Sequence, residues 1–445
     1  MPTCKRLVCL LGLVGLLAIL SGCFVQSTEE LYALPRQSDV YYDLQNAIDA
    51  ALPADAAFSG PLTGSNQQAV QLADLDGDGE DEALVFAKTS GAKPLKVYIF
   101  DDVSGSFSLA TVIEGDGTAF DAVEYVSVDG NPGLEVILGR QLSDQILQSL
   151  SVYAYGEGRM AELMNTSYTE FKVVDLNSDD HQDVLVLRQD PEGRTAVAEY
   201  YTDQNGLMEK TATASLAKEI DSIERITTGF VTTDVPGVFV TSSSGEDTLV
   251  TDVLLFRGQT FLNPTVSPES GLSTQMVRSY LVYATDIDED GLVELPTLVA
   301  LPSVSNEGTY WLVEWYELHT DGTHTKKMTT FYHNAGGWYL TIPEAWAQQL
   351  TVARTAEENG VWRYTFSRWI ERDTTPEEIM SIYVISGEDR LKLAESQGRF
   401  LLAEKGETAY AASLGESALA GSLTEETVRA MFHFIRTDWN SGDIM

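Results

Sequence analysis

Side-chain oxygens recur at fixed spacing in three short segments, each of which precedes an apolar run. Counted from the first acid, they occupy positions 1, 3, 5 and 9 of loop 1 (74–82), loop 3 (175–183) and loop 5 (286–294). The residues are Asp74, Asp76, Asp78 and Glu82 in loop 1, Asp175, Asn177, Asp179 and Asp183 in loop 3, and Asp286, Asp288, Asp290 and Glu294 in loop 5. Ca²⁺ takes about six to eight oxygen ligands in flexible geometry, and the position-7 carbonyl adds one more. We therefore predict about three calcium sites with a structural role.

Two other interpretations of these loops have to be weighed. An EF-hand needs a Glu at position 12 and a helix after the loop. Position 12 is Val85, Val186 or Thr297, and strand-like residues follow, so a β-hairpin loop fits better. The loops could also be solvated acidic turns, because Asp and Gly are common turn residues. Three copies with the same spacing favour the metal.

The acidic loops belong to a longer repeat. Weaker copies, loop 2 (127–135) and loop 4 (229–237), lie between them, and both have too few acids to hold a metal. The five copies start at residues 74, 127, 175, 229 and 286, so the steps are 53, 48, 54 and 57 residues. Each step has room for four short strands. A repeat of this length indicates a stack or ring of similar β units.

The Asp-x-Asp-x-Asp-Gly-x-x-Glu loops between strands resemble FG-GAP or VCBS-type repeats, the family that includes integrin-like β-propellers. The resemblance covers roughly residues 60–335. It implies a mainly β fold, with a β-propeller-like repeat domain of about five recognisable blades at residues 38–335. A smaller α+β domain at residues 336–445 would follow.

The amino terminus has the layout of an export signal. Lys5 and Arg6 precede an apolar run from Leu7 to Leu20, and small residues then lead to Cys23. The run is short for a transmembrane helix, although a plain signal peptide or an anchor helix are the alternatives. Leu20-Ser21-Gly22-Cys23 resembles the lipobox of bacterial lipoproteins. This resemblance implies a signal peptide at 1–22, a lipidated Cys23 carrying acyl chains such as palmitate, and a tether over 23–37.

Composition limits the partners. The chain has 445 residues and a net charge of −39, and removal of Lys5 and Arg6 with the signal peptide would leave −39 − 2 = −41. Such a field repels nucleic acids and anionic lipid headgroups. Cys4 and Cys9 would leave with the signal peptide, so the mature chain would hold no disulfide. We expect a lipid-anchored protein on the extracytoplasmic face of the cell membrane that binds a protein or glycan but no nucleic acid.

Helical spacing is limited to the two ends. Leu44, Ile48 and Leu52 form one stripe of a predicted helix over 40–52. A last helix is predicted from the capping-box pattern at Ser422–Glu425, with Phe434 and Ile435 on its apolar face. Between them, 311–316 and 325–332 are predicted to form a hairpin.

Catalytic motifs are scarce. The chain has no Gly-x-Ser-x-Gly, no His-Glu-x-x-His and no phosphate-binding loop. His319, His324 and His333 cluster near one predicted turn, but solvated histidines explain them better than zinc. A tryptophan- and tyrosine-rich group could stack on sugars, although core packing is favoured. It comprises Trp311, Trp315, Tyr316, Trp338 and Trp346. We predict a non-enzymatic binding protein. A polysaccharide-acting hydrolase or lyase and a purely structural envelope lipoprotein are the alternatives.

Overall fold

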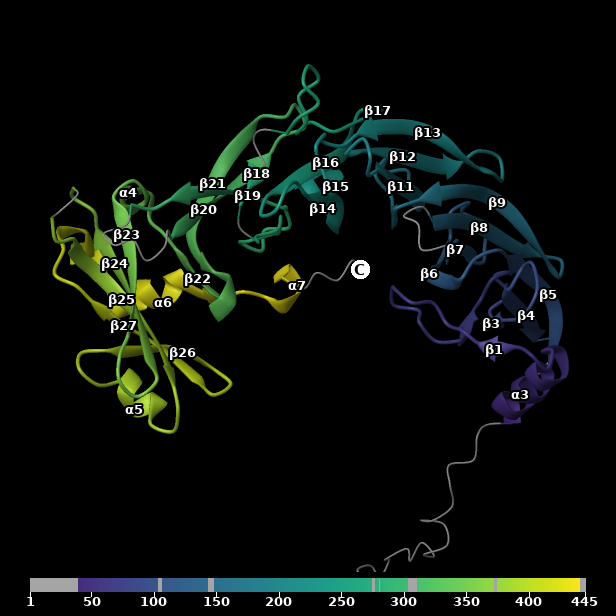
Figure 1. Cartoon of the computed structure of the whole chain (residues 1–445), viewed down its shortest axis with the longest axis horizontal. Helices are drawn as coiled ribbons and strands as arrows, with labels where there is room; N and C mark the ends of the chain where they lie inside the picture. Colours follow the sequence, from purple (N-terminus) through teal and green to yellow (C-terminus); the bar gives the residue numbers. More distant parts are fainter. Residues whose placement is uncertain are drawn as a thin grey trace, which may run out of the picture.

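The computed structural model describes residues 39–102, 106–142, 148–273, 277–279, 281–302, 310–371 and 374–440. The predicted signal peptide (1–22), Cys23 and the tether (23–37) lie outside these residues. The described chain is mainly β and forms a succession of antiparallel sheets along an arc (Figure 1). In the sheets formed by residues 119–168 and 222–262, the first strand lies on the inner side of the arc and the last on the outer side.

Six sheets follow one another in chain order. The first contains β1 (Ala57–Phe58), β2 (Val70–Ala73), β3 (Glu82–Lys88), β4 (Leu95–Asp102) and β5 (Phe107–Gly115). The second contains β6 (Ala119–Val126), β7 (Glu135–Gln141), β8 (Gln148–Gly156) and β9 (Arg159–Tyr168). The third contains β10 (Glu170–Val174), β11 (Asp183–Asp190), β12 (Thr195–Asp203) and β13 (Met208–Ser215). The fourth contains β14 (Ser222–Thr232), β15 (Val235–Ser243), β16 (Leu249–Arg257), β17 (Thr260–Leu262) and β18 (Val277–Arg278).

The last two sheets interlock through the carboxy-terminal segment. The fifth contains β19 (Leu295–Ala300), β20 (Trp311–Leu318), β21 (His324–His333), β22 (Trp338–Thr341) and β28 (Phe432–Phe434). The sixth contains β23 (Leu350–Ala356), β24 (Val361–Arg368), β25 (Glu377–Ser386), β26 (Phe400–Lys405) and β27 (Thr408–Leu414). The hairpin predicted over 311–316 and 325–332 is confirmed by the pairing of β20 with β21.

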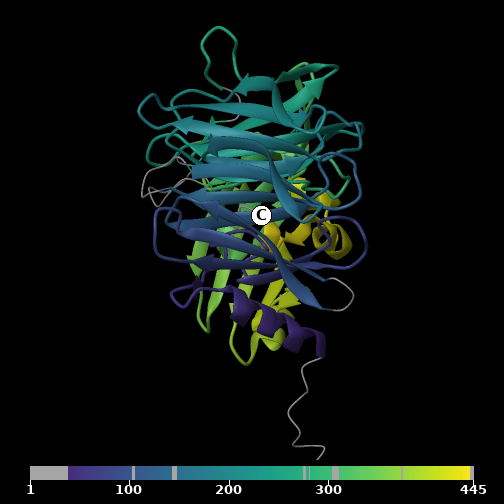
Figure 2. The same cartoon turned by 90° about the vertical axis from the view of Figure 1, so that its right-hand side faces the viewer.

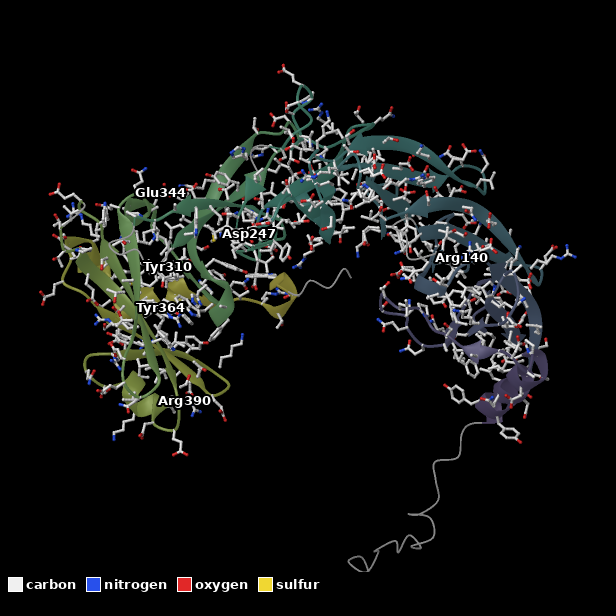
Figure 3. All side chains as sticks on the ribbon, in the orientation of Figure 1. Arg140, Asp247, Tyr310, Glu344, Tyr364 and Arg390 are labelled. Atoms are coloured by element: carbon white, nitrogen blue, oxygen red, sulfur yellow. The ribbon has the colours of Figure 1, made fainter. Side chains whose placement is uncertain are left out.

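Apolar side chains fill both faces of the central strands. In β11, Val184 and Val186 pack toward the second sheet, whereas Leu185 packs toward the fourth. Successive strand residues point to opposite faces, so a strand that is covered on both sides becomes a continuous apolar run. Figure 3 shows side chains occupying the space between neighbouring sheets, and Figure 2 shows the sheets one above another.

Helices cover the two ends of the stack. The amphipathic helix α3 (Asp39–Ala51) lays Leu44 and Ile48 on the first sheet, close to the predicted range of 40–52. At the other end, α5 (Arg390–Ala394) packs Ala394 into the core of the sixth sheet. An end sheet that is covered by its own helix does not need a neighbouring sheet to bury its apolar face. The described residues therefore form an open arc with two capped ends.

The carboxy-terminal segment differs from its prediction. Helix α6 (Glu425–Met431) starts from a capping box between Thr424 and Thr427, not from Ser422, which ends the 3-10 helix η2 (Ala418–Ser422). The prediction that Phe434 and Ile435 continue this helix is wrong. Phe434 lies in β28, whose pairing with Trp338 of β22 extends the fifth sheet. A free sheet edge offers backbone hydrogen bonds, which here outweigh the helical spacing.

The fifth sheet crosses the boundary that was predicted between residues 335 and 336. The 3-10 helix η1 (Asn334–Gly336) forms the turn between β21 and β22, which are paired neighbours. The short helices α4 (Glu344–Ala347) and α7 (Thr437–Asn440) complete the segment after it. One apolar cluster joins Phe331 and Trp338 of the fifth sheet to Phe366 of the sixth. Independent folding of residues 38–335 and 336–445 stays a prediction.

Candidate metal centres

Each acidic loop stands between the first two strand positions of its sheet. Loop 1 joins β2 to β3, and loop 3 joins β10 to β11. Loop 5 precedes β19, and an isolated antiparallel bridge between Thr285 and Glu294 closes it. The position-12 residues Val85, Val186 and Thr297 all lie in strands, which excludes the helix that an EF-hand requires.

The three loops share one backbone conformation. Positions 4 and 6 of each loop are left-handed, although only three of the six residues are glycine. They are Gly77 (φ 77°) and Gly79 (92°), Ser178 (60°) and Asp180 (68°), and Glu289 (62°) and Gly291 (92°). This turn brings backbone N–H groups toward the position-1 carboxylate. Asp74 accepts hydrogen bonds from Gly77 N at 2.7 Å and Gly79 N at 3.1 Å, and Asp286 accepts from Gly291 N at 2.9 Å.

In loops 1 and 5, the position-9 carboxylate accepts a hydrogen bond from the backbone N–H at position 2 of the same loop. Glu82 Oε2 accepts a hydrogen bond from Leu75 N at 2.7 Å, and Glu294 Oε2 accepts one from Ile287 N at 3.0 Å. Both carboxylates are buried, and burial raises the pKa of Glu82 to about 7 and that of Glu294 to about 8. Glu135 of loop 2 makes the same bond to Val128 N at 2.8 Å. This acid therefore supports the turn even where the outer acids are missing.

In loop 3, a shorter acid and a tyrosine together link position 9 to the backbone N–H at position 2. Asp183 lacks one methylene of the Glu found at position 9 elsewhere, and Tyr200 of β12 fills the gap. The Tyr200 hydroxyl donates to Asp183 Oδ2 at 2.5 Å and accepts from Leu176 N at 2.9 Å. Burial raises the pKa of Asp183 to about 7. Sequence analysis missed Tyr200 because it lies in the next strand, outside the spacing of the loop.

The structure brings together many, but not all, of the predicted ligands. A carboxylate oxygen from each member of a group lies within 4.8 Å of the others in Asp74/Asp76/Asp78, Asp175/Asp179/Asp183, Asp286/Asp288/Asp290 and Asp290/Glu294/Glu317. Glu82 is not a member of the loop 1 group, and its Oε2 accepts the hydrogen bond from Leu75 N. Asn177 donates from Nδ2 to Asp179 Oδ2 at 2.9 Å.

Two charged residues of the fifth sheet join loop 5 without any sequence signal near the loop. Glu317 of β20 contributes a carboxylate oxygen to the group with Asp290 and Glu294. Lys327 of β21 places its Nζ 2.5 Å from Asp290 Oδ2 and 2.6 Å from Glu317 Oε1. Local spacing could not have found them, because they reach the loop only through the pairing of β20 with β21.

Loops of neighbouring sheets touch one another. Leu134 N of loop 2 donates to Asp74 O of loop 1 at 3.1 Å. A Cβ on Gly133 would lie 2.5 Å from Leu75 O, and one on Gly130 would lie 2.7 Å from His181 Nε2 of loop 3. The glycines of loop 2 therefore permit the contacts that connect three successive loops. Loop 4 contains a tight hairpin, since only two residues separate the end of β14 at Thr232 from the start of β15 at Val235.

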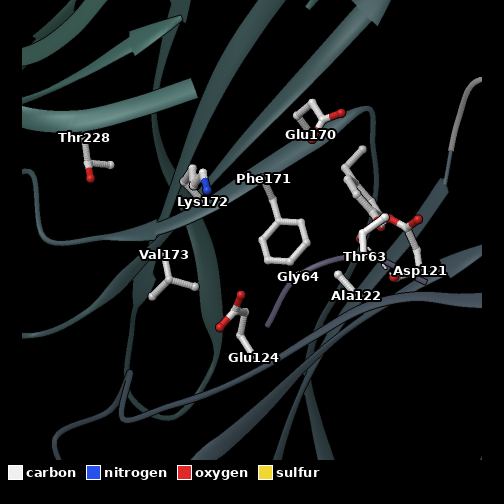
Figure 4. Close-up of a pocket in the computed structure, with 11 residues that line it drawn as sticks. Thr63, Gly64, Asp121, Ala122, Glu124, Glu170, Phe171, Lys172, Val173 and Thr228 are labelled. Carbon is white, nitrogen blue, oxygen red and sulfur yellow. Dashed lines mark hydrogen bonds between the residues drawn. The ribbon is translucent and has the colours of Figure 1, made fainter. Parts of the chain in front are cut away.

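A separate cavity of about 240 Å³ lies on the inner strands β6 and β10 (Figure 4). Glu124, Glu170 and Lys172 line it around Phe171. Burial raises the pKa of Glu170 to about 7, raises that of Glu124, and lowers that of Lys172. This cavity is where the described chain brings two carboxylates with raised pKa values to one pocket away from the loops.

Three of the five aromatic residues lie in the core, and several of the histidines contact neighbouring polar or aromatic side chains. Trp315 and Trp338 are fully buried, and Trp346 is 4% exposed, so the preference for core packing over sugar stacking is confirmed for these three. His333 Nε2 lies 3.0 Å from the Tyr364 hydroxyl, and the His319 ring contacts Thr325. His433, expected in the last helix, instead lies in β28 and stacks on Tyr339.

None of the helices in the described residues is long and apolar enough to span a membrane. No family model and no curated protein match the chain. Among solved structures, the exotype rhamnogalacturonan lyase YesX is similar with a TM-score of 0.30 and 10% sequence identity. The alignment covers 78% of this chain and 62% of that chain, so this chain spans less than two thirds of the lyase. A similarity at this level supports no statement about the fold or the function of this chain.

Proposed function

We propose that the chain is a non-enzymatic bacterial lipoprotein whose propeller-like sheets are stabilised by calcium and present a binding surface to a protein or glycan. One observation carries the proposal, namely that loops 1, 3 and 5 repeat the same left-handed turn and gather carboxylates in it. A solvated turn does not need carboxylates gathered at the same positions in three loops. Oxygen-rich turns of this kind suit a hard cation such as Ca²⁺.

A buried oxygen in loop 5 supports the fit to a cation. Glu294 is fully buried, and within the described residues its Oε1 has no hydrogen-bond partner. A buried acceptor without a donor is costly, and a bound cation would satisfy it. The residues that would hold calcium are Asp74, Asp76 and Asp78 in loop 1, Asp175, Asp179 and Asp183 in loop 3, and Asp286, Asp288, Asp290 and Glu294 in loop 5. The ion would supply positive charge that cancels the repulsion among these acids.

Linkage sets the size of the expected effect. Extracellular calcium modules bind at about 0.1 to 1 mM, so each site would contribute roughly 1 kcal/mol at millimolar calcium. Loops 1 to 3 touch one another, so an ion in one loop also steadies its neighbours. Removal of calcium should therefore loosen the first three sheets together.

Membrane attachment is proposed from the amino-terminal sequence. Cys23 would carry the lipid, and the described fold begins at α3, which starts at Asp39. A stretch of residues 24–38 spans at most about 50 Å even when it is fully extended. The sheets would therefore stand close to the membrane on its extracytoplasmic face. The strong negative charge favours a neutral or basic protein, or a glycan, as the partner.

Two experiments test the proposal. The melting temperature of the full chain in mild detergent should rise with millimolar Ca²⁺ and fall in excess chelator, because only the folded loops gather the ligands. An Asp76→Asn/Asp179→Asn/Asp288→Asn variant should lose this response, whereas an Asp116→Asn variant outside the loops should keep it. Cys23→Ala should release the protein from the membrane fraction. An unchanged melting temperature, or full membrane retention of Cys23→Ala, would contradict the respective part of the proposal.

A polysaccharide-acting hydrolase or lyase is the alternative that one observation favours. Glu124 and Glu170 line one cavity, and both have raised pKa values, as a general acid would need. This alternative predicts turnover of a polysaccharide that Glu170→Gln abolishes. The binding proposal predicts retention of a ligand without turnover. A purely structural envelope protein would show neither retention nor turnover.

A further inference from the structure

We propose that Glu317 is an additional calcium ligand of loop 5 and that Lys327 is a built-in competitor for the same carboxylates, which the ion must displace. The inference rests on the proposed calcium binding and assigns two residues outside the loop to it. It predicts that loop 5 binds calcium more weakly than loop 1, where no protein cation competes with the ion.

The acids of loop 5 are divided between two kinds of partner. Both oxygens of Asp286 accept backbone hydrogen bonds, from Asp290 N at 3.0 Å and from Gly291 N at 2.9 Å. Asp290 Oδ1 accepts from Leu292 N at 2.9 Å, which leaves Oδ2 directed away from the backbone. Besides Asp286, whose oxygens also accept from the backbone, the oxygens open to a cation are those of Asp288, Asp290 and Glu317, together with one oxygen of Glu294.

The Lys327 ammonium already lies among the carboxylates of Asp288, Asp290 and Glu317. Its Nζ is 2.5 Å from Asp290 Oδ2, 3.3 Å from Asp288 Oδ2 and 2.6 Å from Glu317 Oε1. An ammonium group has three donors, so these three carboxylates use all of them. Lys327 thus occupies the oxygens that a metal ion would need.

The lysine nevertheless leaves the innermost oxygen unsatisfied. Glu294 is fully buried, and its Oε1 has no hydrogen-bond partner within the described chain. Oxygens of Asp290, Glu294 and Glu317 lie within 4.8 Å of one another. A divalent ion among these three would contact Glu294 and the acids that Lys327 now holds. The ammonium is an incomplete substitute for that ion.

Loop 1 provides the contrast inside the same chain. Asp74, Asp76 and Asp78 form the equivalent group, and no lysine or arginine of the described residues pairs with them. An ion entering loop 1 displaces no protein cation. Calcium should therefore bind loop 1 more tightly than loop 5, although the two loops share the same acids at positions 1, 3, 5 and 9.

Calorimetric titration with Ca²⁺ alone tests the competition. The full chain in mild detergent carries Asp76→Asn and Asp179→Asn, so that loop 5 dominates the isotherm. Lys327→Met keeps the aliphatic stem and should tighten binding about tenfold, because a competing charge is removed. Glu317→Gln keeps the shape and should weaken it about tenfold. Lys326→Met and Glu314→Gln are matched controls, because these neighbours pair with each other away from the loop.

Lysine acetylation, read by mass spectrometry on the otherwise unchanged chain, gives a second measurement. The Lys327 side chain is 27% exposed while it is held by three acids. Calcium should release it and raise its acetylation several-fold relative to chelator, with Lys326 unchanged as the internal reference. Equal labelling of Lys327 in calcium and chelator would overturn the inference.

The outcomes separate this inference from the proposed function. Calcium binding at loop 1, with a loop 5 affinity that Lys327→Met leaves within about twofold, overturns the inference alone. An absence of calcium binding at every loop overturns both. Tighter binding in Lys327→Met together with released Lys327 supports both.

Discussion

Loops 1 and 5 have the same acids at the same four positions, yet they meet different surroundings. Loop 1 is braced by the backbone of loop 2, through the hydrogen bond from Leu134 N to Asp74 O. Loop 5 is also held by the backbone of its neighbour, through the hydrogen bond from Val293 N to Phe230 O of loop 4, but it is met in addition by side chains of its own sheet, Glu317 and Lys327. The sequence motif therefore determines the turn and the carboxylate oxygens in it. The neighbouring strands determine which other charged side chains lie next to those oxygens.

The largest difference between the loops should appear when the position-9 acid is removed. Glu82→Ala leaves the buried Leu75 N–H without an acceptor and creates a cavity, so it should lower the free energy of unfolding by about 2 to 4 kcal/mol. Glu294→Ala should cost less in chelator, because it also removes an oxygen that has no partner in the described chain. Urea unfolding measures both, with the exposed Glu80→Ala as the control. Equal losses would break the comparison.

The brace of loop 1 gives the next largest effect. A Cβ on Gly133 would lie 2.5 Å from Leu75 O at a φ of 104°, so Gly133→Ala should cost about 2 to 3 kcal/mol. Gly229→Ala, beside loop 5, meets only the end of the Val293 side chain and should cost less. Gly158→Ala, at a φ of 71° with open space around it, isolates the backbone strain. Thermal unfolding ranks the three, and a Gly229→Ala loss as large as that of Gly133→Ala would contradict the contrast.

Loop 3 offers an intermediate case. Tyr200→Phe removes the hydroxyl that links Asp183 to Leu176 N, and it should cost about 1 to 2 kcal/mol. The exposed Tyr41→Phe is a control for loss of a hydroxyl. If the Tyr200 hydroxyl replaces the missing methylene, Tyr200→Phe/Asp183→Glu should recover part of the loss. No recovery would show that position 9 acts differently in loop 3.

The smallest expected effect concerns a buried acid that lies outside the acidic loops. Glu170 lies outside every loop, and burial raises its pKa from 4.5 to about 7. Between these pH values the folded chain binds more protons than the unfolded chain, so stability falls as pH rises through the window. Glu170→Gln should therefore gain on the order of 1 kcal/mol over the parent by pH 8, with or without calcium. The exposed Glu209→Gln is the control, and a calcium-dependent gain would link this cavity to the loops.

Much of this architecture is predictable from local residue patterns. The alternation and turns predicted the strands, and the 48–57-residue repeat predicted successive sheets with the acids in their first hairpins. The helix at 40–52 follows from its apolar stripe, which covers an end of the stack. These features depend on neighbours in sequence, and local patterns contain that information.

The features that sequence analysis missed depend on strand pairing. Tyr200, Glu317 and Lys327 reach the loops from strands whose position is set by the sheet, so no spacing marks them. Phe432–Phe434 was predicted as helix because its apolar spacing suits one, but the edge of β22 recruits it as a strand. The repeat was compatible with either a stack or a ring of sheets, and helices cover both end sheets of the described arc.

Calorimetric titration of the full chain with Ca²⁺ tests the central claim most directly. The account predicts saturable binding at submillimolar to millimolar calcium, with a tighter step that Asp76→Asn/Asp78→Asn removes and a weaker one that Asp288→Asn/Asp290→Asn removes. A Glu80→Gln variant should titrate like the parent. An isotherm without binding heat at two temperatures, or one that all these variants share, would contradict the account and leave the acidic loops as solvated turns.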